Sequence, residues 1–178
     1  LWHSPSAIHK ALTLIEPKGS ETKKEAEQRA KEATRQFKNL LGWCGDKRVQ
    51  YPENDAEEWL RCGAECAAPR PELAISPSRT PSAAYPPTRT HRCAALRPEL
   101  YLQLMKQLTR ADGQRTLSFG GGLDKGWQLL IASLSHWPPP KTVENYLAYF
   151  IRARCPQGEL DKLEMLMHTS IYRGSAKP

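Results

Sequence analysis

The stretch that decides the fold runs from residue 97 to residue 109 and reads Arg-Pro-Glu-Leu-Tyr-Leu-Gln-Leu-Met-Lys-Gln-Leu-Thr. Its apolar side chains recur every three or four residues, as on one face of an α-helix; they are Leu100, Tyr101, Leu104, Met105 and Leu108. The polar side chains between them predict a solvent-facing side, made up of Glu99, Gln103, Lys106, Gln107 and Arg110. Pro98 suits a first helical turn, where its missing N–H is not needed. The stretch therefore predicts an amphipathic helix with a marked start.

Further segments with helical spacing lie on both sides of this helix. They cover residues 4–16, 20–44 and 55–66 before it, and 124–137, 142–154 and about 159–171 after it. We expect the 20–44 helix to be the longest of the first half, with Gly42 and Gly45 at its end. Asp55 and Glu58 have the spacing of a capping box, and Asp124 and Thr142 are expected N-caps.

The expected apolar face of the 142–154 helix consists of Val143, Tyr146, Leu147, Phe150 and Ile151. No segment alternates between apolar and polar residues with period two, as a half-buried strand would. The sequence therefore predicts an all-α fold, a compact bundle of about six principal helices.

The 97–109 helix and the segments after it also carry a family resemblance. The motifs are Leu96 to Thr109, then Gly-Trp-Gln-Leu-Leu at 126–130, Trp-Pro-Pro-Pro at 137–140 and Tyr-Leu at 146–147. They closely resemble the myosin tail homology 4 (MyTH4) domain, whose usual form is Leu-Arg-Asp-Glu-Ile-Tyr-Cys-Gln-Leu-Ile-Lys-Gln-Leu-Thr, with Arg-Gly-Trp and Phe-Pro-Pro later. This chain departs from that form at Pro98, Leu102, Lys125 and Trp137. The resemblance covers residues 96–172 and, more loosely, residues 4–66.

The positions that carry the family motif are expected to be structural. They are Arg97, Glu99, Tyr101, Gln103, Leu104, Lys106, Gln107, Leu108, Gly126, Trp127, Pro138 and Pro139. A glycine beside a large aromatic residue permits close approach of two helices, and a tryptophan supplies a large buried surface.

MyTH4 domains lie in the tails of unconventional myosins, in certain kinesins and beside RhoGAP or pleckstrin-homology modules, often directly before a FERM domain. The resemblance thus implies one domain over residues 1–178 that acts as a noncatalytic adaptor in the cytoplasm. Its partners would be microtubules or cargo, together with a neighbouring FERM or motor domain. The alternatives are a purely structural brace for an adjacent domain and, with less support, a zinc-binding or enzyme fragment. Because the chain begins at Leu1 rather than methionine, we expect it to be a fragment of a longer protein.

Residues 69–92 interrupt the resemblance. They are rich in Pro, Ser, Thr and Arg, a composition that cannot bury enough apolar surface to offset the entropy of ordering, and we expect a disordered loop. The segment Cys66–Leu73 recurs at Cys93–Leu100 with one mismatch. We therefore expect an insertion at about residues 67–93, either a loop of this lineage or a noncoding stretch retained in the gene model. Sequencing the transcript separates the two origins.

The formal net charge of +7 and the pI near 9.3 favour an acidic partner, since excess cations concentrate polyanions near the surface. The candidate basic binding face consists of Lys23, Lys24, Arg29, Lys31, Arg35, Lys38, Lys47 and Arg48. Glutamates at 21, 25, 27 and 32 lie among these residues, so a solvated helix with internal ion pairs is the alternative interpretation. The chain has no groove-reading or base-stacking motif, and nucleic acid is not an expected partner.

Metal and nucleotide sites have little support in the sequence. Cys62, Cys66, His91 and Cys93 supply thiolates and an imidazole, but their spacing matches no familiar zinc module. The tri-glycine at 120–122 lacks the phosphate-binding spacing. We therefore expect no cofactor and no metal.

Catalysis and membrane insertion have equally little support. The five histidines are scattered, at residues 3, 9, 91, 136 and 168, and no Ser or Cys lies in a nucleophile motif, so no catalytic residue is assigned. The five cysteines show no disulfide framework. No apolar run reaches the roughly 18–20 residues of a membrane span.

Overall fold

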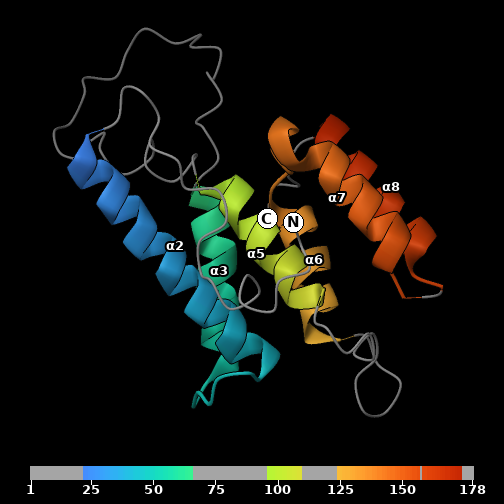
Figure 1. Cartoon of the computed structure of the whole chain (residues 1–178). Helices are drawn as coiled ribbons and strands as arrows, with labels where there is room; N and C mark the ends of the chain where they lie inside the picture. Colours follow the sequence, from blue (N-terminus) through green and yellow to red (C-terminus); the bar gives the residue numbers. More distant parts are fainter. Residues whose placement is uncertain (1–21, 66–95, 110–123, 157, 174–178) are drawn as a thin grey trace, which may run out of the picture.

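The computed structural model describes residues 22–65, 96–109, 124–156 and 158–173, and every regular element in these ranges is an α-helix (Figure 1). The helices are α2 (Lys23–Cys44), α3 (Pro52–Glu65), α5 (Arg97–Leu108), α6 (Lys125–His136), α7 (Lys141–Arg154) and α8 (Leu160–Arg173). These six confirm the predicted all-α class. The helix expected at 4–16, the 69–92 loop and the glycine-rich segment at 120–122 lie outside the described residues.

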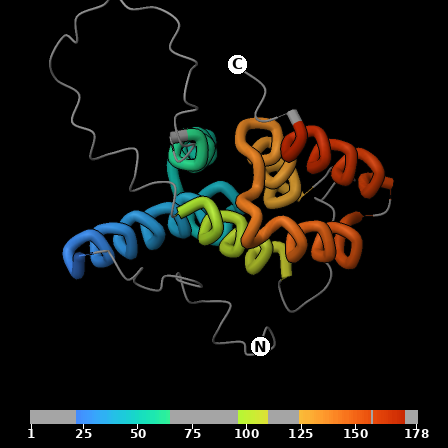
Figure 2. The backbone as a smooth tube through the Cα atoms, turned by 90° about the horizontal axis from the view of Figure 1, so that it is seen from above, coloured from blue at the N-terminus to red at the C-terminus, as the bar shows by residue number. Residues whose placement is uncertain are grey.

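The helices are arranged with α5 and α6 in the middle, α2 and α3 on one side, and α7 and α8 on the other (Figures 1 and 2). Helix α5 packs against α2, α6 and α7, while α6 also contacts α3 and α8. The core lies along these two middle helices, and α2 and α8 are on opposite sides of it.

Helix α5 is buried on nearly every side, so the predicted solvent-facing side is wrong. Glu99, Gln103 and Lys106 are 2%, 0% and 6% exposed, and Leu102 is also buried. An amphipathic pattern predicts one solvent-facing side for a helix at the surface. Helix α5 differs because α2, α6 and α7 cover it from several directions. Only Gln107 on that side is partly exposed, and Arg110 lies outside the described residues.

Hydrogen bonds allow α5 to carry polar side chains into the core. The Gln103 amide donates to the Ala33 carbonyl of α2 at 3.1 Å and to the Glu99 carboxylate at 3.1 Å. Near the end of α5, the Gln107 amide donates to the carboxylate of Asp46. A buried amide without such partners would cost about 1–3 kcal/mol, so these contacts fix α5 against α2.

Trp137 joins α3, α5 and the end of α6. The Tyr101 hydroxyl donates to the Trp137 carbonyl at 2.9 Å, and the two rings meet edge to face with centroids 4.7 Å apart. Arg97 lies 5.8 Å from the Trp137 ring centroid and donates to the Gly63 carbonyl at 3.0 Å. A Cβ on Gly63 would be 2.1 Å from the Trp137 ring, so glycine is required for this contact.

The middle helices also approach closely, as expected from the glycine of the Gly-Trp pair. A Cβ on Gly126 would lie 2.7 Å from Leu108 at the end of α5. Trp127 is 1% exposed and stacks on Phe150 of α7 with centroids 5.8 Å apart. Gly126 and Trp127, which are adjacent in α6, thus contact α5 and α7 respectively.

Two helix starts in the first half differ from the prediction. Thr22 forms the capping box of α2 with Glu25, two residues after the predicted start at residue 20. Helix α3 begins at Pro52, where proline suits the first turn, so the predicted Asp55 cap is wrong and Asp55 lies inside the first turn. Gly45 ends α2 with a φ of 82°, whereas Gly42 is still helical.

In the second half, Asp124 caps α6 as predicted, accepting from the Gly126 N–H at 2.8 Å. The predicted Thr142 cap is wrong. Pro140 occupies that position, and its carbonyl accepts from the N–H groups of Val143 and Glu144.

The outer helices bury one narrow stripe each. Helix α7 buries Val143, Leu147 and Ile151 as predicted, and α8 buries Leu163 and Met167. Tyr146 was predicted on the apolar face, but it is 69% exposed. Its position on the helix turns it away from α5, which already fills the inner side of α7.

Replacing Gly63 by alanine tests the Trp137 contact. Alanine normally stabilises a helix interior relative to glycine by about 0.5–1 kcal/mol. Here we expect Gly63→Ala to lower the free energy of unfolding by about 1–3 kcal/mol, because the new methyl overlaps the indole. Urea denaturation followed by circular dichroism measures the change. The exposed Glu57→Ala change on the same helix is the control, and a Gly63→Ala protein as stable as wild type would contradict the packing described.

Candidate binding face on helix α2

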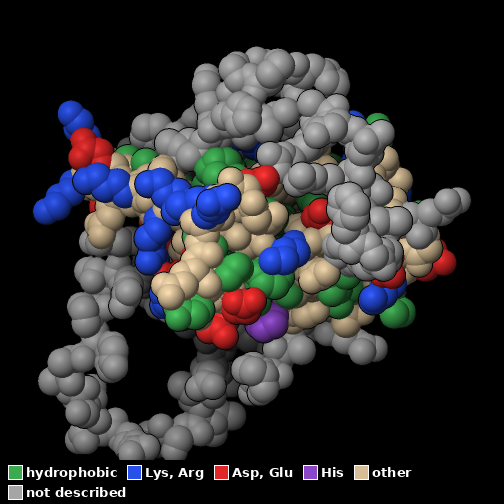
Figure 3. Space-filling model, turned by 90° about the horizontal axis from the view of Figure 1, so that it is seen from below, with side chains coloured by type: hydrophobic (Ala, Val, Ile, Leu, Met, Phe, Trp, Pro, Cys, Tyr) green, Lys and Arg blue, Asp and Glu red, His purple; other side chains and the backbone are tan. Residues whose placement is uncertain are grey.

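One side of α2 presents a row of lysines to solvent. Lys24, Lys31 and Lys38 are exposed and seven residues apart, which places them on one side at intervals of about 10 Å. Lys23 is exposed at the start of the same helix. The Lys and Arg side chains gather where α2 lies in the space-filling view (Figure 3). We call Lys23, Lys24, Lys31 and Lys38 the lysine row.

The side of α2 that faces the core is mainly apolar. Ala33, Phe37 and Leu40 are buried there, and Arg29 is only 7% exposed. Arg29 precedes Ala33 by one helical turn and therefore lies on the buried side of α2. It does not share the surface of the lysine row. Sequence reasoning placed it on the candidate face because it grouped cations without separating the two sides of the helix.

Arg35 is exposed, but its charge is engaged. Its guanidinium is 2.7 Å from Glu32 and 2.6 Å from Glu58 of α3, and Glu58 is also 2.7 Å from Arg61. These contacts agree with the alternative of internal ion pairs for this part of α2. They join α2 to α3, so Arg35 contributes less free charge to the surface than the lysines do.

Glu32 has a perturbed acidity in this network. Burial opposes its ionisation, but hydrogen bonds from Arg35 and Gln36 and the charges of Arg35 and Arg61 outweigh burial. Together they hold the pKa of Glu32 below its ordinary value of 4.5. The hydrogen bond to Glu32, together with the negative charges of Glu32 and Glu58, raises the pKa of Arg35 above its ordinary value.

The basic surface continues past the end of α2. Lys47 and Arg48 are exposed in the turn after Gly45. Lys125, which was not assigned to the face, has its ammonium 4.9 Å from the Trp43 ring centroid. The Trp43 indole N–H donates to the Lys125 carbonyl at 2.8 Å. Only folding brings these residues together, since 82 positions separate them.

Most of the family-motif residues lie in the core rather than on this surface, whereas Arg97, Gln107, Leu108 and Pro138 are half-buried. Tyr101, Leu104 and Trp127 are almost fully buried, and Pro139 is buried after α6. Burial raises the pKa of Tyr101, which keeps its hydroxyl protonated as a donor to Trp137.

The cysteines within the described ranges do not suggest catalysis. Cys62 is 3% exposed in the core, while its suggested zinc partners at 66, 91 and 93 lie outside the described residues. Burial, followed by the charge of Glu159, raises the pKa of the Cys155 thiol to about 11. Its reactive thiolate is therefore a minor species near neutral pH.

The described ranges contain neither a cluster of metal ligands nor a membrane-spanning helix. No group of three or more His, Cys, Asp or Glu residues there has the arrangement of a metal site. None of the helices in those ranges is both long enough and apolar enough to cross a bilayer.

Comparisons with known proteins agree with the motif positions. A family model described as "MyTH4 domain" matches residues 88–176, half of the chain. A curated relative, the "High molecular weight form of myosin-1" of Acanthamoeba castellanii, is 32% identical over 142 residues. That alignment covers 80% of this chain and extends into its first half, but it spans only 7% of the relative. No solved structure matches this chain at a significant level.

The Glu32 network makes a prediction about stability and pH. Since the folded pKa is depressed, the contribution of Glu32 is present above pH 4.5 and is lost as the pH falls through the folded pKa. We expect Glu32→Gln to lower the free energy of unfolding by about 0.5–1 kcal/mol at pH 7. The difference from wild type should shrink below pH 4.5.

Urea denaturation at pH 7 and pH 3.5 measures this difference. Glu57→Gln, at an exposed position on α3, serves as the matched control and should have little effect at either pH. An equal loss of stability at both pH values for Glu32→Gln would refute the linkage to ionisation.

Proposed function

The chain belongs to the MyTH4 domain family, and from this membership we propose that it is a noncatalytic binding module of the cytoskeleton. The family relationship and the likeness to a segment of a myosin-1 support this class of function. Any motor activity would belong to other parts of a longer protein, since the chain matches only 7% of that relative. A cytoplasmic location at the cytoskeleton is part of the same proposal.

The lysine row supports an acidic filament, such as a microtubule, as the partner. It has a regular spacing along one side of α2, and the chain has a net charge of +7. Regularly placed cations attract an extended acidic surface, because each ammonium adds to the local potential. The contacts would be solvent-exposed, so the attraction should weaken as salt shortens the Debye length to about 8 Å at 0.15 M.

Cargo binding and cooperation with an adjacent FERM or motor domain are further parts of this proposal. By helical spacing, Lys24, Lys31 and Lys38 of the lysine row lie opposite the buried stripe of α2 that packs on the core. A partner could therefore bind there without disturbing the packing around α5. If the domain served only to brace a neighbour, charge reversal on this row would leave filament binding unchanged.

Charge reversal of the lysine row is the decisive experiment. A variant with Lys24→Glu, Lys31→Glu and Lys38→Glu should lose microtubule cosedimentation at least about ten-fold, because three attractions become repulsions. Wild-type binding should weaken steeply between low salt and 0.15 M salt. Cosedimentation across a microtubule concentration series at both salt levels gives the apparent dissociation constants.

A second triple variant keeps the same total charge. Lys141→Glu, Arg154→Glu and Lys162→Glu change α7 and α8, on the other side of the core. Filament binding should remain close to wild type in this control. Equal losses of binding in both variants would show that net charge, and not the lysine row, determines filament binding. Wild-type protein that fails to sediment with microtubules at low salt would refute the filament proposal.

A further inference from the structure

A groove between α7 and α8 forms a second candidate surface. Its volume is about 220 Å³. Helix α7 contributes Ala148 and Ile151 to its lining, and α8 contributes Met167 and Ile171. The rest of the lining is polar or charged and consists of Glu144, Asn145, Arg152, Glu164, His168 and Tyr172. Such a groove has room for one large side chain from a partner, between apolar and polar groups.

Helices α7 and α8 carry most of the exposed large hydrophobic side chains of the described ranges. Five large hydrophobic side chains are exposed in the described ranges, and four of them lie on α7 and α8. These are Tyr146, Tyr149, Met165 and Tyr172, which are between 68% and 82% exposed. Tyr172 is the one among these four that lines the groove, whereas Tyr146 lies on the other side of α7 from Ala148 by helical spacing.

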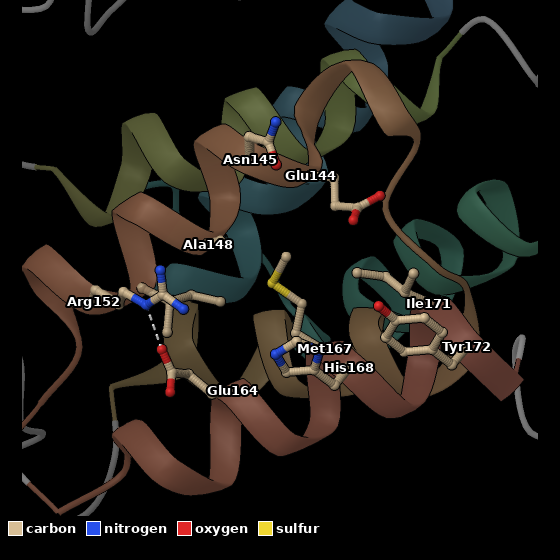
Figure 4. Close-up of a pocket in the computed structure, with 10 residues that line it drawn as sticks. Glu144, Asn145, Ala148, Arg152, Glu164, Met167, His168, Ile171 and Tyr172 are labelled. Atoms are coloured by element: carbon tan, nitrogen blue, oxygen red, sulfur yellow. Dashed lines mark hydrogen bonds and ion pairs between the residues drawn. The ribbon is translucent and has the colours of Figure 1, made fainter.

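The two ends of the groove differ in charge. At one end Arg152 and Glu164 form an ion pair at 2.6 Å, so their charges offset each other (Figure 4). At the other end the carboxylate of Glu144 lies on the same side as Tyr172, with Met167 between the two ends (Figure 4). Among the described residues, the Glu144 side chain has no hydrogen-bond or ion-pair partner. Glu144 is therefore the one carboxylate of the groove lining without an ion pair, and His168 is a further titratable side chain of that lining.

From this arrangement we infer that the α7–α8 groove binds a partner protein segment that carries a large apolar side chain with a lysine or arginine about one helical turn away. The apolar side chain would enter beside Ala148 and Met167. Its basic neighbour would pair with Glu144, which precedes Ala148 by one turn of α7. The chemistry is opposite to that of the lysine row, which favours an acidic partner.

The positions of the two surfaces allow both to be occupied together. Helices α7 and α8 lie across the core from α2 in both views (Figures 1 and 2). A partner in the groove would therefore leave the lysine row accessible. The groove does not depend on the proposed filament binding, and the two proposals can fail separately.

A displayed library of helical peptides tests the groove directly. Peptides are first depleted on the Ala148→Leu variant, whose larger side chain fills the groove, and then selected on wild-type chain. The expected survivors carry Leu, Phe or Trp with Lys or Arg one turn away. Survivors without a basic residue, or an absence of any survivors, would overturn the inference. Thermal unfolding must first show that Ala148→Leu is folded.

The best selected peptide then serves as the probe in fluorescence anisotropy. Glu144→Gln should weaken its binding about five-fold, as expected for a partly exposed ion pair. Glu57→Gln should leave the affinity unchanged, and so should charge reversal of Lys24, Lys31 and Lys38. Equal affinity for wild type and Glu144→Gln would contradict the assigned role of the carboxylate.

Discussion

The burial of a polar-rich helix is the constraint on which the rest of this structure depends. Helix α5 brings Glu99, Gln103 and Lys106 into the interior, where an unpaired polar group is costly. The Gln103 amide meets both the carbonyl of Ala33 and the carboxylate of Glu99. The bond to Ala33 crosses from α5 to α2, and because it is directional it restricts α2 to one position along α5 more strictly than apolar contacts would.

Because α5 lies at the centre, the outer helix pairs α2–α3 and α7–α8 are exposed to solvent on opposite sides of the core. Helix α2 presents lysines on its outer side, while α7 and α8 expose tyrosines and a methionine and form a groove between them. Each outer helix needs only a narrow apolar stripe to pack, so its other positions are free to specialise. One small helical domain can thus present two surfaces with opposite preferences without altering its core.

The sequence predicted the helices better than it predicted their surroundings. Periodicity located α5 and α6, and Asp124 marked a helix start, because these signals are local. Periodicity could not reveal that α5 is covered on its polar side, since that depends on contacts with residues as far away as Ala33. In the same way, Arg29 appeared equivalent to the lysines until the core side of α2 was known. Lys125 joined the basic surface only through its contact with Trp43, which no local pattern encodes.

The bond between Arg97 and the Gly63 carbonyl bears on how this domain can evolve. It joins the end of α3 to the start of α5, two points that are 34 residues apart in the chain. Both ends of the intervening segment are therefore fixed close together by the helices themselves. The entropy lost in closing such a segment rises only slowly with length, by about 0.6 kcal/mol for each doubling. Insertions and deletions between α3 and α5 should thus be tolerated among descendants of this gene, while point changes at Gly63 should be rare.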